Sequence, residues 1–195
     1  MEITIIEGAR GTGKSTLAFK LRQMTPETTL INFTGFHTDG EKGLSKVAEY
    51  YNNWMNFFRN MKKHDSKFIF DRFYFSESVY SRLYKNYNFA PTYRGLNKML
   101  EYMSTSGVKI NIIFLTVNDE NVLKQRLIRE KVPFGKAEET VKESLLQQDA
   151  YRNLFVNFGI NYSNENLNVY TIDTSHISLD EVYDKIVETL QDRSL

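Results

Sequence analysis

The chain has 195 residues, 41% of them hydrophobic and 14% aromatic, so it can build one globular domain and is too apolar for a disordered chain. A formal net charge of +1 argues against a surface that coats nucleic acid, so a nucleic-acid partner is not expected. The sequence has no cysteine, which excludes disulfides, thiolate metal sites and thiol nucleophiles.

Targeting and metal-binding signals are weak in this sequence. The apolar run "ITII" near the N-terminus is too short, and too acidic in its flanks, for a signal peptide. Apolar runs also stay well short of the roughly 20 residues of a membrane span. We therefore expect a soluble, cytoplasmic protein without membrane contact. His37, His64 and His176 lie far apart without metal-ligand spacing, and we expect them to be ordinary polar residues.

Five short apolar runs, separated by longer amphipathic stretches, predict β-strands. Their Ile, Val, Phe and Thr content favours strand over buried helix. Continuous apolar runs are typical of parallel strands that are buried on both faces. The runs cover residues 2–8, 28–33, 67–71, 109–117 and 168–174.

Helical patterns lie between these runs. The main ones cover residues 14–24, 44–63 and 92–106, a segment from the caps at 118–119 to residue 129, and a last helix behind the capping box "SLDE" at 178–181. Gly107 is well placed to end the third helix. Alternating strands and helices predict an α/β domain of three layers, with helices on both faces of a parallel sheet. In such a domain the ligand crevice lies at the carboxyl ends of the strands.

The stretch "IIEGARGTGKST" at residues 5–16 lies where the first strand meets its helix. Gly8, four intervening residues and then Gly13-Lys14-Ser15 match the pattern of a phosphate-binding loop. Glycines let backbone N–H groups approach phosphate oxygens, and the helix N-terminus adds donors and a favourable dipole. Lys14 is expected to reach the β- and γ-phosphates, and Ser15 to bind Mg²⁺. The residues predicted to bind ATP are Gly8, Arg10, Gly11, Thr12, Gly13, Lys14, Ser15 and Thr16.

A second motif, "KFIFDRFYFSESVYSRLY" at residues 67–84, follows another predicted strand. Asp71 closes this strand, where a carboxylate can hold Mg²⁺ through water. Arg72 would then point a guanidinium into the same crevice and bind transferring phosphates. The alternative is a surface Asp-Arg pair, but the phosphate loop favours the functional interpretation.

Together these motifs resemble the thymidylate kinase family and its relatives, the deoxynucleoside kinases. "EGARGTGKST" is similar to their opening loop, including the Glu before the first glycine. "DRFYFSESVY" is similar to the thymidylate kinase segment with Asp71, Arg72, Phe73 and Ser76 on matching positions. "VNDENVLKQRLIRE", residues 117–130, resembles the stretch that leads into the family's lid. The resemblance spans most of the chain and is weakest at residues 34–60.

The resemblance implies a P-loop NTPase fold with a five-stranded parallel sheet of order 2-3-1-4-5, and ATP-dependent phosphoryl transfer to a nucleotide or nucleoside. It places Arg129, and less directly Arg126, on the arginine positions of the lid. Residues 128–140 are the predicted lid, and the alternative for them is a solvated connection between helices. Lys14, Asp71, Arg72, Arg126 and Arg129 form the expected catalytic set, with Ser15 and Asp71 on Mg²⁺. Family members are commonly dimers, so a homodimer is also considered.

The acceptor side departs from the family. The helix before the third strand carries no arginine until Arg59, so Arg10 or Arg94 would have to hold an acceptor phosphate. The nucleoside kinases use a Glu after the second strand as base, and here none occurs until Glu41. Asp71, Arg72 and Ser76 follow the monophosphate enzymes.

The acceptor therefore has several interpretations. The first is a (deoxy)pyrimidine monophosphate, and the second is a deoxynucleoside. A non-catalytic ATP-binding module and a kinase for another small acceptor are further alternatives. Tyr51, Trp54 or Phe57 could stack on the base, with Asn52 or Asn53 reading its edge. For each aromatic residue taken singly, the buried face of a helix is the favoured interpretation.

Overall fold

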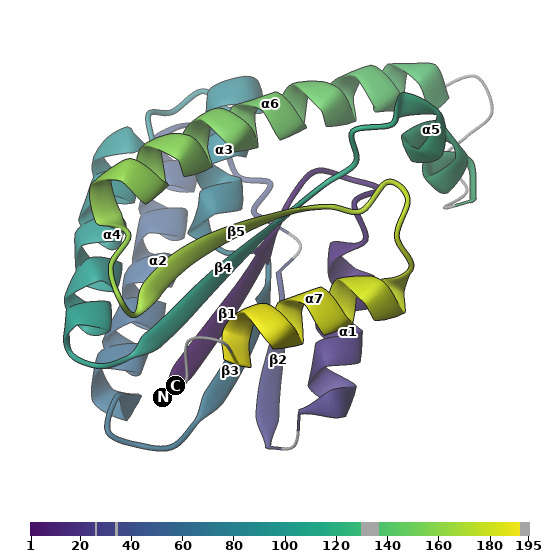
Figure 1. Ribbon diagram of the computed structural model, residues 1–195. Coiled ribbons are helices and arrows are strands. Elements are labelled where there is room, and N and C mark those ends of the chain that lie inside the picture. The colour runs from purple at the N-terminus through teal and green to yellow at the C-terminus, as the bar shows by residue number, and fades with distance from the viewer. Residues whose placement is uncertain (26, 34, 130–136, 192–195) are drawn as a thin grey trace.

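The computed structural model describes residues 1–25, 27–33, 35–129 and 137–191. Five parallel strands form one sheet of order β2-β3-β1-β4-β5, which confirms the predicted topology (Figure 1). The strands are β1 (Glu2–Glu7), β2 (Thr28–Asn32), β3 (Lys67–Asp71), β4 (Lys109–Thr116) and β5 (Leu167–Asp173).

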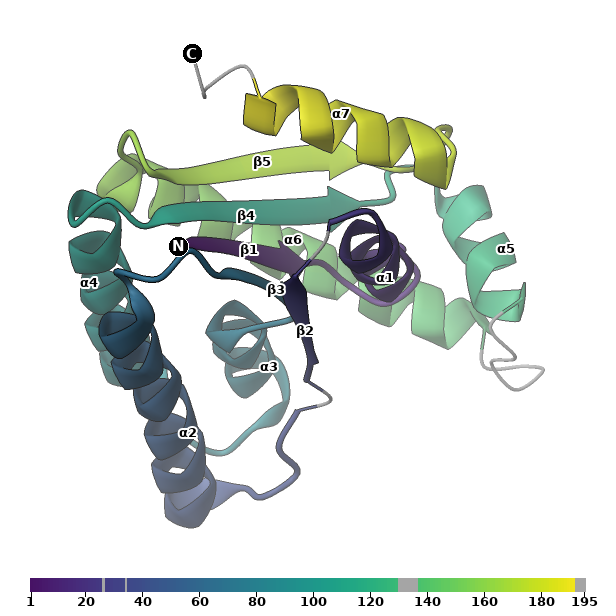
Figure 2. The ribbon, with the colours of Figure 1, turned by 90° about the horizontal axis from the view of Figure 1, so that it is seen from below.

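Helices connect the strands and cover both faces of the sheet. They are α1 (Lys14–Met24), α2 (Gly40–Met61), α3 (Tyr74–Tyr84), α4 (Ala90–Thr105), α5 (Glu120–Arg129), α6 (Ala137–Tyr162) and α7 (Leu179–Gln191). Figure 2 shows α1 and α7 on one side of the sheet and α2, α3, α4 and α6 on the other. Among the described residues, no helix is both long enough and apolar enough to cross a lipid bilayer.

Alternation along the central strands supplies a separate core to each face. On β1, Ile3 and Ile5 pack with α2, α3, α4 and α6, whereas Ile6 packs with α1 and α7. On β4, Ile112 and Ile113 divide between the two cores in the same way. This is the period of two expected for a strand buried on both faces.

Caps set two of the helix ends that the sequence predicts, the end of α4 and the start of α7. Gly107 has φ 89° and follows α4, where its N–H and that of Val108 donate to the carbonyls of Ser104 and Met103 at 3.0 and 3.2 Å. This is a Schellman motif, and only a residue that tolerates positive φ fits it well. Ser178 and Glu181 form the predicted capping box of α7: the Ser178 N–H donates to Glu181 Oε2 at 2.7 Å and the Glu181 N–H to Ser178 Oγ at 3.2 Å.

The start of α2 differs from the prediction. The helix begins at Gly40 rather than at residue 44, because Asp39 caps it by accepting from the Gly40 N–H at 2.7 Å. The same Asp39 oxygen accepts from the Asn86 N–H at 2.8 Å, which ties the start of α2 to the chain after α3. A partner 47 residues away is not visible in a local sequence pattern.

Two glycines, Gly8 after β1 and Gly95 inside α4, test how closely the chain packs at the end of the central strand. Gly8→Ala should lower the free energy of unfolding by roughly 2 kcal/mol or more, since its Cβ would lie 2.5 Å from the Leu115 carbonyl oxygen, with φ 148°. Gly95→Ala, inside α4 with nothing within 4 Å of its Cβ, should raise it by about 0.5–1 kcal/mol. Urea unfolding of both variants measures this, and equal stabilities would contradict the packing at Gly8.

Candidate active site

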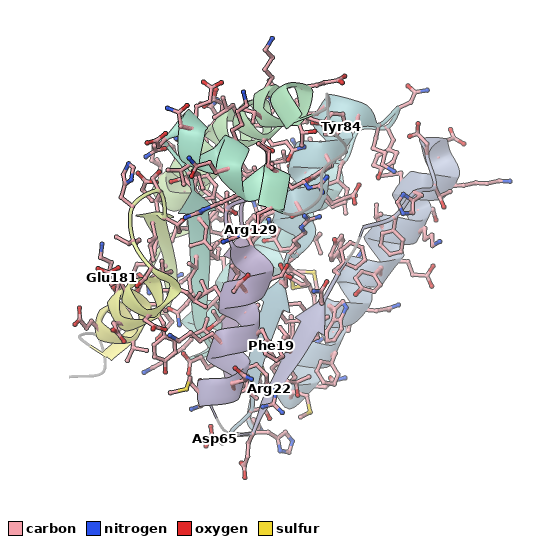
Figure 3. All side chains as sticks on the ribbon, turned by 90° about the vertical axis from the view of Figure 1, so that its right-hand side faces the viewer. Phe19, Arg22, Asp65, Tyr84, Arg129 and Glu181 are labelled. Carbon is pink, nitrogen blue, oxygen red and sulfur yellow. The ribbon has the colours of Figure 1, made fainter. Side chains whose placement is uncertain are left out.

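The carboxyl ends of the strands form one edge of the sheet, and the motif residues gather there. Strand register pairs Asp71 with Ile6 on one side and with Asn32 on the other, so the ends of β2, β3 and β1 are level. Figure 3 looks onto this edge and shows Arg129, at the end of α5, close to the N-terminal end of α1. The parallel topology thus brings residues far apart in sequence into one crevice.

The phosphate loop leaves β1 through three glycines with positive φ. Gly8, Gly11 and Gly13 have φ of 148°, 80° and 90°. Thr12 Oγ1 donates to the Ala9 carbonyl at 2.9 Å and closes the loop on itself. Gly13 is the N-cap of α1 without a side-chain cap, and the first turn of α1 has no acidic residue. This helix end is therefore suited to an anion.

Lys14 lies inside the loop. Its side chain is buried, with 5% of the residue exposed, and Nζ donates to the Ala9 carbonyl at 2.7 Å. Ser15 and Thr16 follow in the first turn of α1 and are exposed, and Arg10 is exposed within the loop. The ammonium thus has a fixed place beside the backbone groups that would surround a polyphosphate.

Asp71 has the features of a metal-associated carboxylate. It is 2% exposed, and Oδ2 accepts from Asn32 Nδ2 at 3.0 Å. Oδ1 is buried without a hydrogen-bond partner, which is unusual for a carboxylate unless a water or an ion serves it.

The Mg²⁺ expected with ATP is compatible with these residues. Within the described residues there is no group of three or more His, Cys, Asp or Glu side chains that could hold a metal. Mg²⁺ needs no such cage when it arrives with a nucleotide, because it keeps waters and phosphate oxygens as ligands. The exposed Ser15 hydroxyl and the unpartnered Asp71 oxygen are the groups that would hold it.

A first cavity of about 370 Å³ lies on the β4–β5 side of the phosphate loop. Arg126 is part of its wall: the guanidinium donates to Thr174 Oγ1 at 2.8 Å, to the Thr174 carbonyl and to the Gly11 carbonyl at 3.4 Å. Arg126 thus joins α5 to the loop after β5, while the exposed Arg129 also lines the cavity. The lining residues are Gly11, Thr12, Gly13, Thr16, Leu17, Leu115, Arg126, Arg129, Thr174, Ile177, Ser178, Leu179 and Val182.

A second cavity of about 200 Å³ lies on the β2–β3 side. Arg72 contributes to it with φ 75°, and its guanidinium lies 5.9 Å from the centroid of the Tyr80 ring. Lys85 donates to the carbonyls of Phe36 and Thr38 at 2.8 and 3.4 Å, and so holds the loop after β2. The lining residues are Phe33, Gly35, Phe36, His37, Arg72, Ser76, Glu77, Tyr80 and Lys85.

Glu77 is a cavity residue that the sequence interpretation did not identify. It is 5% exposed, and Oε1 accepts from the Tyr87 hydroxyl. Burial raises the pKa of the Glu77 carboxyl, an effect opposed by the Tyr87 hydrogen bond and by Lys85. A carboxylate in the wall of this cavity can accept a hydrogen bond from a donor group of a ligand.

Glu7, identified from sequence only as part of the family resemblance, is also buried at this edge. It is 0% exposed and accepts from the backbone N–H groups of Phe73 and Ser76 and from the Ser76 hydroxyl. Burial raises the pKa of Glu7 to about 7, and the Ser76 and Phe73 hydrogen bonds, Arg72 and Lys14 limit the rise.

Several predicted acceptor residues lie elsewhere. Tyr51 is 0% exposed in the core, and Trp54 packs on Phe58 and Phe70, with ring centroids 5.7 and 5.1 Å away. Phe57 is 40% exposed and packs edge-on against Phe68, with ring centroids 5.7 Å apart. These aromatic residues, the exposed Asn52 and Asn53, and the exposed Arg94 do not line either cavity. The core interpretation therefore replaces base stacking for Tyr51 and Trp54. Of the predicted lid, residues 130–136 lie outside the described residues.

The sheet order and the phosphate loop together are those of the P-loop NTPase fold that the sequence predicts. No protein-family model matches this sequence, and no curated protein sequence matches it.

Solved structures are similar to the chain. One is deoxyadenosine kinase from M. mycoides with dCMP and dCDP, at 15% identity and TM-score 0.55, covering 98% of this chain and 100% of that one. Polyphosphate kinase 2 from Arthrobacter aurescens TC1 has 15% identity and TM-score 0.62, covering 98% and 67%. A putative polyphosphate kinase 2 from Pseudomonas aeruginosa PA01 has 16% identity and TM-score 0.65, covering 99% and 42%. At such identities the similarity shows the fold.

Glu7 makes stability depend on pH in a predictable direction. Because its pKa of about 7 in the folded protein exceeds the ordinary 4.5, the folded state holds a proton that the unfolded chain has lost. This stabilisation is fully present below pH 4.5 and disappears as the pH rises through 7. The free energy of unfolding should fall by roughly 3 kcal/mol over this range because of Glu7. Glu7→Gln should remove this slope.

Urea unfolding of both proteins between pH 4.5 and 8.5 measures the slope. Other titrating groups are shared by the two proteins and cancel in the difference. If the free energies of unfolding of the two proteins change with pH in the same way, Glu7 does not have the raised pKa.

Proposed function

We propose that the chain is an ATP-dependent phosphotransferase whose acceptor is a nucleoside. The observation that carries this proposal is the position of the phosphate loop, with Lys14 inside it, after the central strand and between two cavities. The loop itself lines the first cavity, and Arg72 lines the second. A transferase of this kind needs two substrates to meet at one phosphoryl group, and one cavity on each side of a phosphate site serves that need.

The first cavity is the proposed site for the nucleoside part of ATP. The triphosphate would then run along the loop to the amide groups of α1 and to Lys14. A Mg²⁺ ion bound with ATP, near Ser15 and Asp71, would neutralise part of the phosphate charge. Lys14 and Arg72 would flank the transferred group and stabilise the charge on its equatorial oxygens. Arg126 shapes the cavity wall in this proposal, and Arg129 is an arginine of the predicted lid at residues 128–140.

The composition of the second cavity favours a nucleoside as acceptor. Phe33, Phe36 and Tyr80 offer ring faces on which a base can stack. The lining contains two cations, Arg72 and Lys85. Lys85 already donates to two backbone carbonyls, which leaves Arg72 as the cation that would hold an acceptor phosphate. A nucleoside monophosphate, favoured by Arg72 itself, is the second candidate, and it would need that guanidinium to hold its phosphate.

A coupled assay of ADP release tests the proposal. With Mg-ATP, deoxyadenosine or deoxycytidine should stimulate ADP release, and stimulation by the monophosphates alone would favour the second candidate. Lys14→Met should lose roughly 3 kcal/mol of transition-state stabilisation, more than a hundredfold in kcat/KM, whereas the exposed Lys63→Met should not. Intact ATP binding without transfer to any acceptor would contradict the proposal and favour a binding module. Inorganic polyphosphate in place of ATP tests the alternative donor.

The Glu77 carboxylate should determine which nucleoside bases the second cavity accepts. A carboxylate accepts hydrogen bonds from the exocyclic amino groups of adenine and cytosine and repels the carbonyl oxygens at the same edge of thymine. Glu77→Gln should therefore reduce the preference for deoxycytidine over thymidine about tenfold or more. The ratio of kcat/KM values should be measured at pH 8.5, with the exposed Glu49→Gln of α2 as control. An unchanged ratio would show that Glu77 does not face the base.

A further inference from the structure

A chain of three buried side chains begins at Ser76 in the wall of the second cavity and continues into the protein interior. Tyr151 and Glu7 are 0% exposed, and Ser76 is 5% exposed. Ser76 Oγ donates to Glu7 Oε2 at 2.5 Å and lies 2.7 Å from the Tyr151 hydroxyl. When Glu7 is ionised, the Ser76 hydroxyl donates to Glu7, so the Tyr151 hydroxyl donates to Ser76. The order of donation is therefore Tyr151 to Ser76 to Glu7.

Glu7 acts as the cap of α3. The N-cap residue of this helix is Phe73, which makes no side-chain cap hydrogen bond. Glu7 Oε1 instead accepts from the Phe73 N–H at 2.7 Å and from the Ser76 N–H at 3.4 Å. A carboxylate on β1 thus satisfies the Phe73 N–H at the start of α3 and shares the Ser76 N–H with the Phe73 carbonyl, which lies 3.1 Å from that nitrogen.

Arg72 is fixed by the same end of β1. Its φ of 75° is unfavourable for a residue with a side chain and persists only where neighbours determine it. The Arg72 N–H donates to the Ile6 carbonyl at 3.0 Å, and the next N–H, of Phe73, donates to Glu7. Two consecutive residues of β1 therefore hold the peptide groups on both sides of Arg72.

The chain also links three parts of the site. Glu7 directly precedes Gly8 of the phosphate loop, Ser76 lies on α3 at the second cavity, and Tyr151 comes from α6. A carboxylate is retained here even though burial disfavours its charged form.

We propose that Glu7, held in place by Ser76 and Tyr151, is a positioning residue that keeps the Arg72 guanidinium in the second cavity at a fixed place relative to the phosphate loop. The proposal rests on the proposed function, and none of the three side chains needs to touch the transferred phosphate. Loss of the chain should therefore slow transfer while leaving ATP binding nearly intact, because the loop and the first cavity do not depend on Ser76 or Tyr151.

Variants that remove single hydroxyls provide the test. Ser76→Ala and Tyr151→Phe should each lower kcat about tenfold or more, while the dissociation constant of a non-hydrolysable ATP analogue changes less than about threefold. The kcat of the double variant should be close to that of the slower single variant, because both hydroxyls act through one hydrogen-bonded chain. Ser78→Ala, a buried serine of the same helix, and Tyr74→Phe, whose hydroxyl donates to Asn97 at 2.8 Å, are matched controls with near wild-type kcat.

Amide hydrogen exchange separates failure of this proposal from failure of the proposed function. In Ser76→Ala, the Phe73 and Ser76 amides should exchange at least about tenfold faster than in Ser78→Ala, whether or not any acceptor is phosphorylated. Unchanged exchange, or a kcat loss equal to that of the controls, would overturn the positioning role. Wild-type protein without transfer activity, but with the expected exchange, would overturn only the phosphotransferase proposal.

Discussion

The central strand ends in two residues that tolerate almost no change, and the rest of the site depends on that junction. A Cβ on Gly8 would lie 2.5 Å from the β4 backbone, so only glycine lets the chain leave the sheet there and turn into the phosphate loop. The preceding residue, Glu7, places its carboxylate in the protein interior, where it pairs with N–H groups of α3. One dipeptide therefore orients the loop on one side and the Asp71-Arg72 segment on the other.

The two halves of the crevice are built by different physical means. On the loop side, glycine conformations and backbone groups dominate, and these follow directly from local sequence. On the other side, aromatic rings, Glu77 and Arg72 come from elements separated by long connections, and Lys85 holds the loop after β2 through two carbonyls. Shape and charge there depend on packing, which explains why the proposed acceptor is harder to infer from sequence than the proposed phosphate donor.

Much of the fold was predictable because its signals are local. Apolar runs identified all five strands, since a strand buried on both faces has no polar alternation to hide it. Gly107 and the Ser178–Glu181 capping box set helix ends through contacts within five residues. The start of α2 was placed four residues late because the second partner of its cap, the Asn86 N–H, lies far along the chain. Tyr51 and Trp54 were ambiguous for the same reason: an aromatic residue on a helix looks alike in a core and in a binding site.

By itself, the sequence determined that the chain alternates strands and helices, that a glycine-rich phosphate loop follows the first strand, and that Asp71 ends another strand with Arg72 directly after it. Tertiary structure alone decided that Glu7 caps α3, that Tyr151 of α6 reaches Ser76, and that Glu77 lines a cavity beside Arg72. The physical reason is that loop geometry and strand burial depend on neighbours in sequence. A buried hydrogen bond depends instead on which distant residues the sheet order and helix packing bring within about 3 Å.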